Sequence, residues 1–171
     1  MKLPSWALVL VCTAAATTSL AGDPSALADE LIADLERRGA VQALQSSHAR
    51  QEVLDVLFEQ VSAGSEKWLR LAMAYRAVAP APYSTELDSM VALALREKPE
   101  QVLKLLQSQR GAAAMTVASV CDGEAVAYVE HREGAAKEWR AAAEKKLRFV
   151  RSKQLQQSRD QCLSYLRGRQ R

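Results

Sequence analysis

Apolar residues recur along this chain at the three- and four-residue spacing of an α-helix, and no stretch alternates apolar and polar residues as a half-buried strand would. The remaining positions are rich in Ala, Leu and Gln, which have high helix propensity. Gly, Pro, Ser and Thr interrupt the apolar stripes, and these residues typically start or end helices. The sequence therefore predicts an all-α fold, an irregular antiparallel helical bundle.

The interrupting residues give the expected helix boundaries. A first helix is predicted from Asp23-Pro24 to Gly39, followed by a short turn over residues 41–44. Residues 79–82, with two prolines, form a break, and Thr85-Glu-Leu-Asp88 after them has the pattern of a capping box. Further helices are predicted over residues 47–64, 65–78, 85–95, 99–106, 112–121, 135–150 and 153–166, with a brief piece around Tyr128.

The sequence contains one weak internal repeat. The string EVLDVLFEQVSAG at residues 52–64 resembles EQVLKLLQSQRG at residues 100–111. The two copies lie near the spacing of HEAT-type helical repeats, which favours solenoid-like layering of the helices. Two copies do not make an array, so an irregular bundle stays the main expectation.

The amino-terminal residues have the pattern of a secretory leader. Lys2 supplies a positive charge, residues 6–16 are almost all apolar, and Ser19-Leu20-Ala21 places small residues where a signal peptidase cleaves. The apolar run is also shorter than the ~20 residues of a membrane-spanning helix. We expect cleavage after Ala21, with residues 22–171 forming a single helical domain; a buried first helix is the alternative. The low Ile and Asn content beside abundant Ala and Arg is typical of a GC-rich bacterial gene, which predicts a periplasmic or secreted protein.

Loss of the leader would leave two of the three cysteines, Cys121 and Cys162. Two cysteines in an exported protein usually form a disulfide, because the compartment is oxidising. Each shares a helical face with apolar residues, so both thiols are expected to point inward. A zinc site would need four ligands at a recognised spacing, and a thiol nucleophile would need a nearby base and an exposed position. We therefore expect a structural Cys121–Cys162 disulfide.

Charge is unevenly distributed. Residues 22–136 carry 17 acidic and 11 basic side chains, whereas residues 137–171 carry 3 acidic and 11 basic ones. A solvated helix face explains such a pattern most simply, but the asymmetry can also mark a binding surface for an acidic protein or an anionic membrane. Nucleic acid is disfavoured, because the cations are not interleaved with aromatic residues. The predicted basic face consists of Lys137, Arg140, Lys145, Arg148 and Arg151.

Recognised catalytic and metal-binding motifs are missing from the sequence. Only His48 and His131 could act as a base near neutral pH. His48 precedes Glu52 by one expected helical turn, an arrangement more typical of a surface contact than of a catalytic pair. The sequence therefore predicts no enzyme, no cofactor and no metal site.

Four strings, EKWLRLA, LREKPEQVLKLL, SVCDGE and SRDQCLSYL, carry a resemblance. From about Ser65 onward the chain resembles a group of secreted bacterial helical proteins without an assigned activity, and the resemblance implies structural roles for Pro99, Cys121 and Cys162. At the level of class it is similar to periplasmic immunity proteins, small disulfide-bonded helical proteins that block cell-wall-degrading toxins. The expected function is thus a non-enzymatic periplasmic protein-binding domain, an inhibitor or immunity factor against a secreted toxin. The alternative is an envelope-associated structural or stress protein whose basic helix contacts anionic lipid.

Mass spectrometry of the natively produced protein tests the leader and the disulfide together. We expect a chain that begins at Gly22 and weighs two hydrogens less than its fully reduced form. An intact Met1 together with two free thiols would contradict both expectations.

Overall fold

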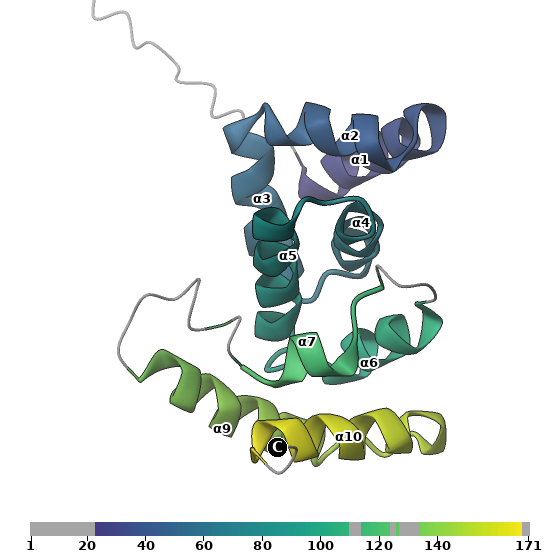
Figure 1. Cartoon of the computed structure of the whole chain (residues 1–171). Coiled ribbons are helices and arrows are strands. Elements are labelled where there is room, and N and C mark those ends of the chain that lie inside the picture. The colour runs from purple at the N-terminus through teal and green to yellow at the C-terminus, as the bar shows by residue number, and fades with distance from the viewer. Residues whose placement is uncertain (1–22, 110–113, 124–125, 127–133, 169–171) are drawn as a thin grey trace, which may run out of the picture.

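The computed structural model describes residues 23–109, 114–123, 126 and 134–168, and it is all-α over these ranges (Figure 1). The predicted fold class is confirmed. The predicted leader and the predicted piece around Tyr128 lie outside the described residues. The α-helices are α1 Pro24–Arg38, α2 Ala40–His48, α3 Gln51–Ser62, α4 Glu66–Arg76, α5 Ala81–Ala94, α6 Pro99–Ser108, α7 Val117–Cys121, α9 Ala135–Leu147 and α10 Gln156–Leu166, and a 3-10 turn, η1 Lys153–Leu155, precedes α10.

The helices stack along one long axis (Figure 1). α1 and α2 cover one end, α3 to α5 form the middle, and α9 and α10 lie across the other end beneath α6 and α7. α5 is central and packs against α3, α4, α6 and α7. Every residue from Leu87 to Leu95 is buried, since a helix with neighbours on most sides has little surface left for solvent.

Some predicted boundaries are confirmed. α1 begins after Asp23, whose carboxylate accepts a hydrogen bond from the Ser25 amide at 2.9 Å, and it ends at Gly39. α6 begins at Pro99. Both starts follow from local chemistry, because an Asp cap and a first-turn proline need no distant partner.

The region predicted as a short turn over residues 41–44 is instead part of helix α2. The following helix, α3, begins at Gln51 and not at Ser47. Ser47 is buried at the end of α2, where its hydroxyl lies 2.7 Å from the Tyr75 hydroxyl of α4. Contacts with α1, α3 and α4 hold this nine-residue helix, which is too short to be stable alone.

The capping box predicted at Thr85 is wrong. α5 already begins at Ala81, with Pro82 in its first turn, and the Thr85 hydroxyl donates to the Ala81 carbonyl inside the helix at 3.2 Å. Asp88 is buried and pairs with Arg76 of α4 at 2.8 Å. A capping box does occur at the start of α7, which is shorter than predicted, between Thr116 and Ser119.

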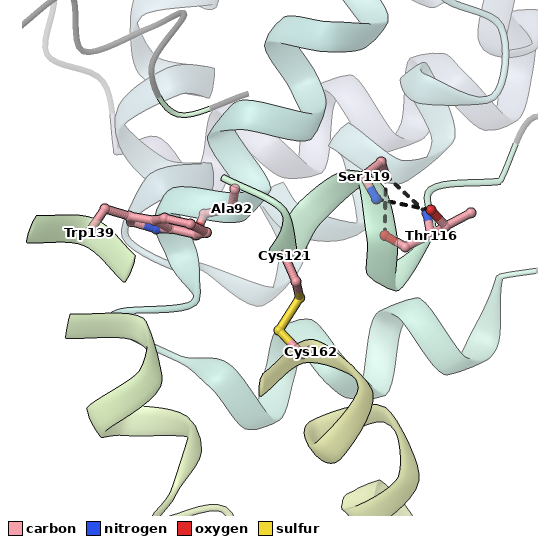
Figure 2. The surroundings of a disulfide bond; sticks show 6 residues. All are labelled: Ala92, Thr116, Ser119, Cys121, Trp139 and Cys162. Carbon is pink, nitrogen blue, oxygen red and sulfur yellow. Dashed lines mark hydrogen bonds between the residues drawn. A yellow bond between two sulfur atoms is a disulfide. The ribbon is translucent and has the colours of Figure 1, made fainter. Parts of the chain in front are cut away.

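The predicted disulfide is present. Cys121 at the end of α7 bonds Cys162 of α10, with an S–S distance of 2.05 Å, and both residues are fully buried (Figure 2). The two cysteines are 41 residues apart in sequence, so the bond closes a loop that contains all of α9. It therefore ties the last two helices to the rest of the bundle.

α9 has a second anchor in Trp139. This side chain is 1% exposed, and its indole nitrogen donates to the Ala92 carbonyl of α5 at 2.9 Å (Figure 2). The bond satisfies the one polar group of a ring that otherwise packs in the core. The buried stripe of α9 continues through Ala143 and Leu147 to Val150.

Replacing both cysteines by alanine tests how much the disulfide stabilises the fold. We expect the Cys121→Ala, Cys162→Ala variant to lose roughly 4 kcal/mol in free energy of unfolding, because the unfolded chain regains the freedom of the closed loop. Urea unfolding measures the loss, and the wild-type protein under reducing conditions should show a similar one. An unchanged unfolding midpoint would contradict the assigned role.

Candidate interaction surface

The five residues of the predicted basic face differ in exposure and in the contacts that they make. Lys137, Lys145 and Arg151 are exposed, and they form no ion pair among the residues that the structure describes. Arg148 is exposed and bonds Glu144 at 2.7 Å. Arg140 is partly buried, and its guanidinium donates to the Asp122 carbonyl at 3.0 Å. Arg140 therefore links α9 to the residue that follows α7, and its guanidinium is not a free surface cation.

The position of Arg140 depends on Gly123. Gly123 has a φ of +80°, in the left-handed region that favours glycine. A Cβ there would lie 2.8 Å from Arg140 Nε and 2.8 Å from a Trp139 ring carbon. A side chain at residue 123 would therefore force the Arg140 or Trp139 side chain to move from its present position.

Cations do gather at the carboxyl end of α9 and in the turn that follows it. Residues 145–153 contain five cations and no carboxylate. We name the surface formed by Lys145, Lys146, Arg148, Phe149, Arg151 and Lys153 the basic corner. Three of its members, Lys146, Phe149 and Lys153, were not among the predicted site residues, although the run KKLRFVRSK shows them directly.

The helix dipole accounts for some of the cations at the basic corner but not for all of them. Lys145 and Lys146 lie in the last turn of α9, where a positive charge interacts favourably with the partial negative charge of the helix end. Arg151 and Lys153 lie beyond the end of the helix, so the helix dipole does not account for them. Together these four residues form an exposed set of cations without an ion-pair partner in the described part of the chain.

Phe149 lies in the middle of the basic corner and is 67% exposed. Its neighbours Leu147 and Val150 are buried, and the Phe149 amide donates to the Lys146 carbonyl at 3.1 Å. The Val150 carbonyl accepts a hydrogen bond from Arg159 of α10 at 2.9 Å. These hydrogen bonds order the backbone on both sides of Phe149, whose side chain is exposed to solvent.

Glu144 borders the basic corner and connects α9 to α10. Its carboxylate accepts from Arg148 at 2.7 Å and from Arg167 at 2.9 Å. These two hydrogen bonds, first to Arg148 and then to Arg167, lower the pKa of Glu144 below its ordinary value. The carboxylate therefore remains ionised at neutral pH and partly offsets the charge of Arg148.

The half of the stack away from the basic corner is acidic. Residues 24–62, which form α1 to α3, carry seven Asp and Glu side chains against three Lys and Arg side chains. α1 and α2 lie at the end of the stack away from α9 and α10 (Figure 1). The charge asymmetry of the sequence is therefore also a separation of charge in space.

The histidines do not form a catalytic pair in the described residues. α2 ends at His48, and Glu52 belongs to α3, where Arg50 bonds its carboxylate at 3.2 Å. The predicted one-turn pairing of His48 with Glu52 is therefore not formed. The His48 ring instead meets the Tyr83 ring edge-on, with centroids 4.8 Å apart. His131 lies outside the described residues.

Among the described residues, the open grooves away from the basic corner include two with apolar lining. One of about 690 Å³ lies between α4 and α6, and one of about 410 Å³ lies between α2 and the start of α5. Within the described ranges, no three His, Cys, Asp or Glu residues are close enough to hold a metal ion, and no helix is long and apolar enough to cross a membrane.

Comparison with known protein families, with characterised proteins and with solved structures finds no match to this chain. The feature with the most distinctive chemistry is the basic corner, where four exposed cations without an ion-pair partner among the described residues lie close in the chain to an exposed aromatic side chain.

Replacing Glu144 by glutamine tests the link between α9 and α10. A carboxylate with a lowered folded-state pKa stabilises the fold above its unfolded pKa, near 4.5, and this contribution is lost as pH falls through the folded pKa. We expect Glu144→Gln to unfold at a lower temperature than wild type at neutral pH, and the difference to shrink below about pH 4.5. Thermal unfolding from pH 7 to pH 3 measures this, with Glu59→Gln as the control for charge. A difference that stays constant over this range would contradict it.

Proposed function

We propose that the chain is a non-enzymatic binding protein of the bacterial periplasm, and that its basic corner contacts an acidic surface of another protein. The observation that carries the proposal is the set of exposed cations without partners, Lys145, Lys146, Arg151 and Lys153. Such a set attracts an acidic surface from solution and fixes the orientation in which it binds.

The fold supports a role in binding. The disulfide and Trp139 fix α9 and α10 on the bundle, so the backbone that carries the basic corner is in place before a partner binds. A preformed surface loses little conformational entropy on binding. A disulfide in a small domain is also compatible with an oxidising compartment, as export to the periplasm would require.

Within this class, we propose an inhibitor or immunity factor that binds a secreted toxin. A small, rigid, disulfide-bonded helical domain with a charged binding surface has the features expected of a protein that blocks another by occupying its surface. The similarity to periplasmic immunity proteins is one of class, and fold class alone does not determine function.

Anionic lipid is the alternative partner. Each cation near an anionic membrane contributes about 1 kcal/mol, so the basic corner would be attracted to such a surface. However, Trp139, Ala143 and Leu147 are buried in the core, so α9 has no free apolar face to insert between lipids. The basic corner could touch a membrane only through its cations and Phe149, which makes a protein partner the better-supported proposal.

Charge reversal tests the proposed function. Tagged full-length protein is purified from the envelope fraction of the producing cells as wild type, as Lys145→Glu with Lys146→Glu, and as Lys104→Glu. Lys104 is exposed on α6 outside the basic corner and serves as the matched control. We expect one partner to co-purify with wild type and with the control, but about tenfold less with the double variant, and high salt to release it.

Flotation with vesicles of phosphatidylglycerol and phosphatidylethanolamine separates the two partner classes. The proposal expects no flotation that depends on the basic corner. Flotation of wild type that is lost in the double variant, with no protein recovered, would favour the lipid alternative.

A further inference from the structure

Phe149 differs from the other exposed large hydrophobic side chains. Val41 and Val78 line the groove between α2 and α5, and Phe58 lies on α3 beside Glu59 and Arg96. Phe149 is the most exposed of these four, at 67%, and its neighbours in the chain are cations and buried residues. Phe149 is thus the most exposed of the four side chains, and it lies in a stretch of nine residues that contains five cations.

The turn leaves Phe149 no simple way to reach the core. Leu147 and Val150 fill the buried positions on either side of it, at 0% and 2% exposure. The Arg159 guanidinium holds the Val150 carbonyl, and it pairs with Asp160 at 2.8 Å. Since turning the ring inward would displace buried side chains, the ring is already in the position in which a partner would meet it.

An exposed aromatic ring and exposed cations contribute to binding in different ways. Burying one Phe side chain in a partner's pocket strengthens affinity by about tenfold to a hundredfold. Charges at the rim of an interface mainly accelerate association and select the partner, and each adds little affinity because water screens them. Energetically dominant interface residues are typically aromatic or Arg residues surrounded by a polar rim.

The arrangement of the cations indicates the shape of the complementary surface. Lys145 and Lys146 precede Phe149 in the chain and Arg151 and Lys153 follow it, so positive charge lies on both sides of the ring along the chain. A surface that complements it would offer an apolar pocket for the ring and carboxylates near that pocket for the neighbouring cations.

We infer that Phe149 is the anchor residue of the basic corner and that the partner is a protein with an apolar pocket ringed by Asp and Glu side chains. This inference rests on the proposed function and adds the chemistry of the contact. An anionic lipid surface is the competing occupant, and the experiment below distinguishes it.

Site-specific photo-crosslinking tests the inference in producing cells. The probe p-benzoylphenylalanine replaces Phe149 in the full chain, Phe58 as the matched exposed phenylalanine, and Lys146 as a rim position. We expect a discrete protein adduct from position 149 and none from position 58. The crosslinked partner peptide should contain apolar residues near Asp or Glu, and Lys145→Glu with Lys146→Glu should reduce the adduct at least about tenfold.

Affinity for the captured partner gives the second measurement. We expect Phe149→Ala to weaken binding by about tenfold to a hundredfold, Phe58→Ala to leave it unchanged, and Phe149→Leu to retain most of it. Circular dichroism and the unfolding midpoint confirm that each variant is folded, since both phenylalanines are exposed.

The outcomes separate the inference from the proposed function. A protein adduct from position 146 with none from position 149 would overturn the anchor while leaving the proposed function in place. A position-149 adduct whose peptide lacks carboxylates would overturn the pocket chemistry. Adducts to lipid alone would assign the basic corner to the membrane, and the absence of adducts from both positions would overturn the inference and the proposed function together.

Discussion

The bond between Cys121 and Cys162 is the constraint on which the carboxyl-terminal half of the structure depends. It joins a short helix, α7, to the last helix and encloses α9 between its ends. Trp139 then fixes α9 against α5 through the Ala92 carbonyl. Because both attachments lie in the core, the surface that α9 and α10 present to solvent has one defined geometry. The basic corner is a product of this packing.

The sequence predicted the fold where the decisive chemistry is local. The Asp23 cap, Gly39 and Pro99 set helix ends through their own backbone and side-chain properties. The disulfide joins residues 41 positions apart and is not local, but Cys121 and Cys162 are the two cysteines that remain if a leader containing Cys12 is removed. α2 was missed because Ser47, which the sequence predicts to start the next helix, lies inside α2, where its hydroxyl contacts Tyr75 of α4. The capping box at residue 85 failed because the Thr side chain can bond an earlier carbonyl within a helix as readily as it can cap one.

The candidate surface was only partly predictable. Periodicity separates buried from exposed positions on α9, but it cannot tell which cation will find a free carbonyl, as Arg140 does at Asp122. Phe149 is apolar but does not join the core. It is exposed because α9 ends at Leu147 and Val150, not Phe149, enters the interior after the turn. Whether residue 149 or residue 150 is buried depends on how α10 packs, and a short stretch of sequence does not contain that information.

The separation of charge along the stack gives the molecule a permanent electric dipole, negative at α1 to α3 and positive at α9 and α10. A nearby charged body exerts a torque on such a dipole as well as a net force. An acidic partner would therefore rotate the molecule during diffusion so that α9 and α10 face that partner. A larger fraction of encounters would bring α9 and α10 against the partner. The gain in association rate would be greatest at low ionic strength.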